Sequence, residues 1–246
     1  MADYVCRVGS FSAQGHRSNN EDRFVVDNDQ HLYMVADGMG GQDCGEQASG
    51  LAAEIIPKAV QTHFAEHHDA PSAMQHAFAE ANKAIVSAGR KQPAGHRRMG
   101  TTAVVALQQA NQLFVAGLGD SRAYLIRGDK VEQLTVDHSV AQALVTQGIL
   151  KQEEAKNSPW SHVLHKFLGC AEMMEGADVR PYALEPGDRL VMASDGLTNH
   201  ASDADLRKAI KEHPDVQDCA EYLVKFALDH GSRDNVTCVV VAFERE

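Results

Sequence analysis

The sequence predicts an α+β fold in which two pairs of helices cover the outer faces of two β-sheets. Apolar residues first alternate with polar ones in short runs, as in strands, and then recur at helical spacing over two long stretches. The alternation returns in the middle of the chain, and helical spacing followed by a last strand pattern recurs near the end. No linker rich in proline, glycine or serine divides the 246 residues, and no periodic repeat is present. A single domain over residues 1–246 is therefore expected.

The first part of the chain combines short strands with a pair of amphipathic helices. Strands are expected at residues 4–10, 23–27 and 32–36, and helices at residues 46–64 and 72–88. Residues 15–22 are too polar and too long for a tight hairpin, so they form either a solvated loop or part of a site. His63, His67 and His68 have spacing that would suit a metal, but no acid stands between them, which favours a solvated helix end.

The second part begins with β-period residues and ends with another helix pair. An antiparallel meander is expected from strands at 101–107, 113–118, 122–126 and 131–134. A short helix at 140–147 opens a polar segment, about 138–170, that is typical of a functional flap. Further strands at 179–184, 189–193 and 236–243, with helices at 203–211 and 216–229, complete the prediction.

Composition excludes several classes of protein. Lys and Arg number 23 against 34 Asp and Glu, and the net charge of −11 repels nucleic acid and anionic membranes. The five cysteines include no C-x-x-C pair, which argues against a disulfide framework or a zinc cage. The first residues show no basic and apolar leader, and no uncharged apolar run approaches 18 residues. A reduced, cytoplasmic location is expected.

Four aspartates stand where apolar strands meet turns. Asp37, Asp120 and Asp195 each follow an apolar run, and Asp234 precedes the last one. A single Asp-Gly pair usually marks a hairpin turn, but four acids in equivalent places indicate one shared site. The glycines beside Asp37 allow close approach of the backbone to a ligand.

The chemistry of these acids favours a hard divalent cation. Carboxylate oxygens select Mg²⁺ or Mn²⁺ over Zn²⁺ or Cu²⁺, and converging carboxylates do not stay ionised without cations between them. Two such cations can share a water, lower its pKa and direct it at phosphorus. A phosphate dianion also needs a bidentate cationic donor, and Arg17 is the candidate.

Seven ordered motifs carry a resemblance to the metal-dependent PPM or PP2C family of serine/threonine phosphatases, in its bacterial form. The motifs begin at these residues and span nearly the whole chain: Arg17, Asp37, Met99, Gly119, Leu134, Ser194 and Asp234. The resemblance implies a four-layer α-β-β-α sandwich with two antiparallel sheets. It also implies hydrolysis of phosphoserine and phosphothreonine monoesters by a metal-bridging water or hydroxide.

The resemblance assigns roles to individual residues. Asp37 matches the family's bridging ligand, the carbonyl of Gly38 helps the second metal, and Asp195 and Asp234 complete the first. Asp120, with Asp195, matches a third and weaker metal site. Glu21 and Asp22 match acids that hold metal-bound waters. Arg17 matches the phosphate-binding arginine.

Two positions depart from the family pattern. Met39 stands where animal-type relatives carry a proton-donating histidine, so a metal-bound water is the expected donor and the general acid stays open. In the flap, residues 157–162 lack the arginine that bacterial members commonly carry. This second departure affects the expected substrate preference and not the metal chemistry.

The resemblance also implies partners, and it leaves two rival functions. Phosphorylated serine and threonine proteins are the expected substrates, with a cognate Ser/Thr kinase in the same signalling system, and a monomer is expected. One rival is a pseudo-phosphatase that binds without turnover, which the presence of all four aspartates and Arg17 disfavours. The other is a phosphodiesterase, which would use the same acids on a diester.

Overall fold

The computed structural model describes residues 4–40, 44–92, 99–156, 158–171 and 176–245. Gly41, in the motif that begins at Asp37, and Asn157, in the flap segment 157–162, lie outside the described residues, as do residues 93–98. In this part of the chain, no helix is both long and apolar enough to cross a membrane.

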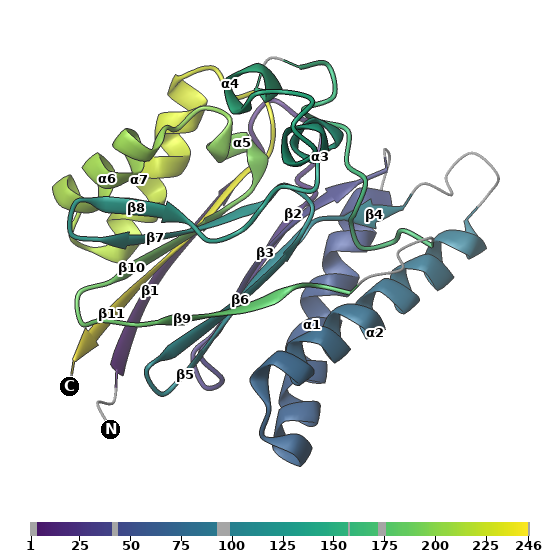
Figure 1. Cartoon of the computed structure of the whole chain (residues 1–246), viewed down its shortest axis with the longest axis horizontal. Coiled ribbons are helices and arrows are strands. Elements are labelled where there is room, and N and C mark those ends of the chain that lie inside the picture. The colour runs from purple at the N-terminus through teal and green to yellow at the C-terminus, as the bar shows by residue number, and fades with distance from the viewer. Residues whose placement is uncertain (1–3, 41–43, 93–98, 157, 172–175, 246) are drawn as a thin grey trace.

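Two antiparallel sheets form the centre of the molecule (Figure 1). The first has the order β1 (Tyr4–Ala13), β11 (Val236–Arg245), β10 (Arg189–Ala193), β7 (Arg122–Arg127) and β8 (Lys130–Gln133). The second has the order β2 (Asp22–Asp27), β3 (Leu32–Met39), β5 (Ala103–Gln109), β6 (Gln112–Leu118) and β9 (Val179–Ala183), with the short β4 (Gly100–Thr101) paired to β3.

Helices cover the outer face of each sheet. The helices α1 (Cys44–His67) and α2 (Ala70–Lys91) lie against the second sheet, and α6 (Asp203–Glu212) and α7 (Val216–Asp229) lie against the first. The shorter helices α3 (Val140–Thr146), α4 (Gln152–Ala155) and α5 (Asp195–Thr198) lie at the end of the sandwich opposite the two chain termini (Figure 1). The four-layer sandwich implied by the resemblance is therefore confirmed.

Strand alternation explains the layers. Along β3, Leu32 and Met34 pack in the cluster formed with α1 and α2, whereas Tyr33 and Val35 pack between the two sheets. Asp37 has the same parity as Tyr33 and Val35, so the sequence directs its carboxylate toward the edge of the inter-sheet layer. The same alternation that buries the core thus places an acid at its rim.

Three sequence predictions need correction. The strand expected to end at residue 36 runs to Met39, because β4 pairs with Gly38 and Met39, so Asp37 lies within a strand and not in a turn. Asp195 is the first residue of α5, a helix that the sequence analysis did not predict. The strand expected at 101–107 is divided at Thr102.

The predicted meander is also wrong. The β5–β6 hairpin belongs to one sheet and the β7–β8 hairpin to the other, so the chain crosses between sheets at Gly119 and Asp120. Gly119 has φ +98°, and a Cβ there would lie 2.5 Å from the Thr102 side chain, which only glycine avoids. The histidines at the end of α1 agree with expectation, since His67 and His68 are exposed.

Candidate active site

A cavity of about 820 Å³ opens at the flap end of the sandwich. Five carboxylates from five separate parts of the chain line it: Glu21, Asp37, Asp120, Asp195 and Asp234. Gly38 and Met39 also line the cavity, and Arg17 is the one permanent cation among its described lining residues. The structure thus brings together all four aspartates that the sequence predicted to share a site.

The two sheets each contribute acids because their strands end at the same edge. Asp37 comes from β3 of the second sheet, Asp195 follows β10 and Asp234 precedes β11 of the first sheet, and Asp120 lies where the chain crosses between them. The cavity therefore lies between the sheets, at the edge where the inter-sheet core ends.

Hydroxyl groups fix the backbone around Asp37. The Asp37 amide donates to Thr102 Oγ1 at 2.9 Å, and the Thr102 amide and Thr101 Oγ1 both donate to the Asp37 carbonyl, at 2.8 and 2.9 Å. Thr102 Oγ1 lies 2.7 Å from Ser121 Oγ, beside Asp120. Buried threonine and serine hydroxyls thus couple the positions of two acids, which explains two of the motifs in structural terms.

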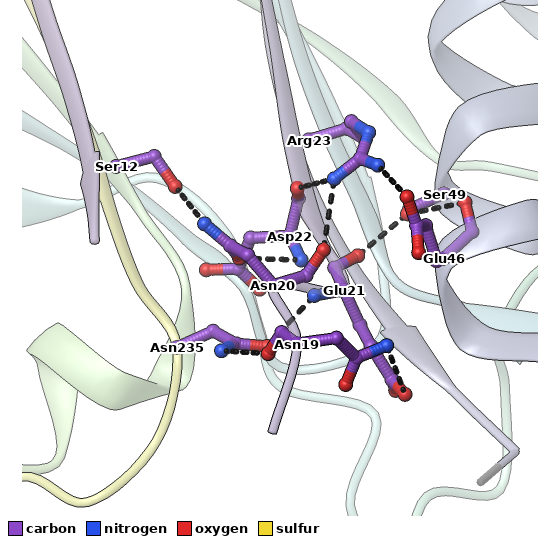
Figure 2. A network of polar contacts seen from close by, with 9 residues as sticks. All are labelled: Ser12, Asn19, Asn20, Glu21, Asp22, Arg23, Glu46, Ser49 and Asn235. Carbon is purple, nitrogen blue, oxygen red and sulfur yellow. Dashed lines mark hydrogen bonds and ion pairs between the residues drawn. The ribbon is translucent and has the colours of Figure 1, made fainter. Parts of the chain in front are cut away.

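The loop between β1 and β2 is held on both sides (Figure 2). On one side, Arg23 forms an ion pair with Glu46 of α1 at 2.6 Å, and Ser49 Oγ donates to the Glu21 carbonyl at 2.5 Å. On the other side, Asn235 Oδ1 accepts from the Glu21 amide at 2.8 Å. The loop of residues 15–22 is therefore part of the site and not a solvated excursion.

Asn235, from the segment before β11, holds this loop in place, and no sequence prediction was made for it. Its side-chain amide also donates to the carbonyls of Gln14 and Asn19, at 2.8 and 2.9 Å, and the residue is 5% exposed. A buried amide that uses both N–H donors and its oxygen is a strong local constraint. The available signal was its place directly after Asp234 in the last motif.

Arg17 reaches across the cavity mouth. Its Nη2 lies 2.6 Å from Asp234 Oδ2, and its side chain is 59% exposed. The pKa of the guanidinium is raised because the hydrogen bond and charge of Asp234, with Asp37 and Glu21 nearby, outweigh partial burial. The guanidinium therefore remains cationic at the mouth of an acidic cavity, where an anionic ligand would enter.

Burial and mutual repulsion perturb the acids. Burial raises the pKa of Asp37 well above its ordinary value, and the charges of Asp22, Asp195, Asp120 and Asp234 raise it further. Burial and the Asp195 charge raise the pKa of Asp120 to about 7. The pKa of Asp195 is raised by burial and by Asp234. Such a set retains protons unless positive charge is supplied.

Asp22 does not line the cavity. It is 2% exposed and pairs with Asp37 across β2 and β3, and its Oδ2 accepts from Ser194 Oγ at 2.8 Å. Its Oδ1 has no protein partner among the described residues. Burial raises its pKa to about 7, an effect opposed by hydrogen bonds from Thr237 and Ser194. Glu21, by contrast, reaches the cavity itself.

The flap supplies His162, which the sequence analysis did not assign. His162 lines the cavity, and its Nδ1 lies 4.0 Å from Asp195 Oδ2. Leu164 and Phe167 from the same segment also line the cavity. The only sequence signal was the unusual composition of residues 157–162, in which the missing arginine is evident but no motif marks the histidine.

The donor set fits a hard divalent cation. Its groups are carboxylate oxygens and the Gly38 backbone, with no thiolate, and burial and neighbouring acids raise the pKa of Asp37, Asp120 and Asp195. Within the described ranges, no three His, Cys, Asp or Glu side chains already converge as a complete ligand cluster. The carboxylates line the cavity without forming such a cluster.

Comparison with known proteins agrees with this geometry. A family model described as protein phosphatase 2C matches residues 6–144. The serine/threonine phosphatase stp of Listeria innocua is 32% identical over 92% of this chain and 90% of its own length. The crystal structure of the Mycobacterium tuberculosis serine/threonine phosphatase PstP/Ppp superposes with a TM-score of 0.88 at 32% identity, covering 98% of this chain and 99% of that one.

A second solved structure, the catalytic domain of PstP in complex with two manganese ions, superposes with a TM-score of 0.84 at 32% identity and covers 98% of this chain and all of that one. The sequence relatives and the structural neighbours thus agree over nearly the full chain, and the cavity holds the four aspartates and Glu21 of the resemblance, with Asp22 outside its lining. This chain belongs to the protein phosphatase 2C family and is a serine/threonine protein phosphatase of that type.

Proposed function

We propose that the chain hydrolyses phosphoserine and phosphothreonine monoesters in proteins and that it depends on Mn²⁺ or Mg²⁺. The single observation that carries this proposal is the meeting of five carboxylates and Arg17 in one cavity. The solved PstP domain with two manganese ions supports the choice of metal. When bound, divalent cations neutralise phosphate charge and lower the pKa of water.

The residues divide the work by position. Asp37, Gly38, Asp195 and Asp234 would hold two cations at the cavity floor, and Asp120 with Asp195 would hold a third. Arg17 at the mouth would bind phosphoryl oxygens, exchanging its contact with Asp234 for the substrate. Glu21 lines the cavity and would orient the metal-binding residues. Asp22 lies outside the cavity and would support them through its hydrogen bond with Ser194, the residue before Asp195.

The cavity also accounts for the expected substrate class. The cavity has a volume of about 820 Å³ and is lined in part by flap residues, so a phosphorylated side chain would enter it while the peptide backbone stays outside. We further propose that residues 1–246 act as one domain with a flap at about 138–170, as a monomer in the cytoplasm. In a signalling system it would oppose a Ser/Thr kinase.

Phosphate release from a panel of phosphopeptides tests the proposal. Wild type should release phosphate from phosphoserine and phosphothreonine peptides with Mn²⁺ or Mg²⁺ and should stop after exhaustive chelation. Asp37→Asn, which keeps the side-chain volume, should lower turnover by orders of magnitude. The exposed Asp178, which is not among the cavity residues, provides the matched Asp178→Asn control and should not change turnover.

Two outcomes would reject the proposal in different ways. Tight binding of phosphopeptides without release would identify a pseudo-phosphatase. Faster hydrolysis of bis(4-nitrophenyl) phosphate than of 4-nitrophenyl phosphate would identify a phosphodiesterase instead.

A further inference from the structure

We infer that His162 of the flap donates a hydrogen bond to the leaving oxygen of the substrate, a role that rests on the proposed phosphatase function. His162 is the one described side chain that reaches the cavity from the flap with a nitrogen donor. The side chain is 71% exposed, so a substrate at the mouth can reach it. Met39, also in the lining, offers no donor.

The backbone holds His162 over the mouth. One flap residue on each side of it is hydrogen-bonded to the start of α3. The Ala141 amide donates to the Trp160 carbonyl at 3.2 Å, and the Val140 amide donates to the Val163 carbonyl at 2.7 Å. A further bridge joins Ser139 and Leu164. His162 is thus fixed between anchored neighbours although its side chain is exposed, which limits the entropy lost when it meets a ligand.

The direction of attack places the leaving oxygen on the side of His162. Hydrolysis joins a water oxygen to phosphorus and breaks the bond from phosphorus to the side-chain oxygen, which keeps the bonding electron pair. The two hydrogens of the water end on the alcohol and on the phosphate. Displacement is in line, so the leaving oxygen lies opposite the water. The Asp195 side chain is 20% exposed and the His162 side chain 71%, so with the water among the carboxylates the leaving oxygen faces the more exposed side, where His162 lies.

The imidazole is available for this contact. Its Nδ1 lies 4.0 Å from Asp195 Oδ2, which is beyond hydrogen-bond distance, and across the described residues no hydrogen bond uses either ring nitrogen. Arg17 lines the same cavity as His162. The phosphoryl oxygens and the leaving oxygen would therefore meet two different donors, Arg17 and His162.

Leaving-group dependence tests the inference. His162→Phe keeps a flat ring and removes both nitrogens, whereas His162→Gln keeps an N–H donor. His162→Phe should lower kcat/KM on a phosphothreonine peptide by about 10- to 100-fold, the usual effect of losing a hydrogen bond to a charged oxygen. On 4-nitrophenyl phosphate, whose leaving oxygen needs little stabilisation, the loss should be under about threefold. His162→Gln should recover part of the peptide activity.

Two further measurements make the result specific. Calorimetric titration with Mn²⁺ should give the same affinities for His162→Phe and wild type. His165→Phe changes a histidine of the same flap that does not line the cavity, and it should keep wild-type kinetics on both substrates.

The inference is overturned by equal losses on both substrates, by unchanged peptide kinetics, or by weaker Mn²⁺ binding, which would make His162 a metal ligand. Each of these requires that wild type releases phosphate from the peptide. Failure of wild type itself would reject the proposed function rather than the role of His162.

Discussion

Raising the pH should destabilise the protein when divalent cations are removed by a chelator. Asp22 and Asp120 have pKa values near 7 in the folded protein against an ordinary value of 3.8, because burial and neighbouring acids disfavour their charged forms. At pH 7 the folded state therefore binds more protons than the unfolded chain. Stability contributed by these groups is fully present below pH 3.8 and is lost as the pH rises through 7.

The magnitude follows from the proton difference. At pH 7 each carboxyl is about half protonated when folded, so the pair takes up about one proton, which corresponds to about 1.4 kcal/mol per pH unit. Between pH 6.5 and 8 the free energy of unfolding should fall by about 1–1.5 kcal/mol, after a reduction for water at the half-buried Asp120. Below pH 6.5 the half-buried His138, with its pKa lowered to about 4, opposes this trend.

Urea denaturation in chelator at pH 6.5, 7, 7.5 and 8 measures the effect, and the midpoint should fall by about 0.5 M. Asp120→Asn should reduce the dependence of the urea midpoint on pH, because an amide takes up no proton. Adding Mn²⁺ should stabilise the protein more at pH 8 than at pH 6.5, since metal and protons compete for the same carboxylates. A midpoint that stays constant or rises with pH in chelator would refute the electrostatic account of the cavity.

Three further predictions concern single residues. Arg17→Ala should raise KM for phosphopeptides by about 10- to 100-fold, as expected for the loss of a charge-assisted contact. The affinity for Mn²⁺ should stay equal or increase, because Asp234 loses a competing cation. Unchanged steady-state kinetics would show that Arg17 does not contact the substrate. Asp120→Ala should abolish only the weakest Mn²⁺ binding event in calorimetry, and loss of every event would place Asp120 among the main ligands. Asn235→Ala should lower the free energy of unfolding by about 2–3 kcal/mol, because three part-buried hydrogen bonds to the backbone are lost. A change below about 0.5 kcal/mol in urea denaturation would contradict the role of Asn235 in holding the loop.

Local sequence patterns were enough to predict most elements and the main acids. Alternation and helical spacing depend only on neighbouring residues, so the strands and the two long helix pairs were predicted with small errors at their ends. The acids were recognised because each interrupts an apolar run, a feature that Asp37 and Asp195 display within a few residues. Chemistry then restricted the metal, since carboxylate oxygens favour hard cations.

Tertiary structure decided how these pieces are partnered. The β5–β6 and β7–β8 hairpins look like one meander in sequence, because nothing local records that the chain crosses between sheets at Asp120. The support of the site depends on contacts far apart in the chain, such as Asn235 with Glu21 and Asp22 with Ser194. His162 could not be predicted for the same reason. Its role depends on the cavity that it lines, and a single histidine in an irregular segment has no periodic pattern that would identify it.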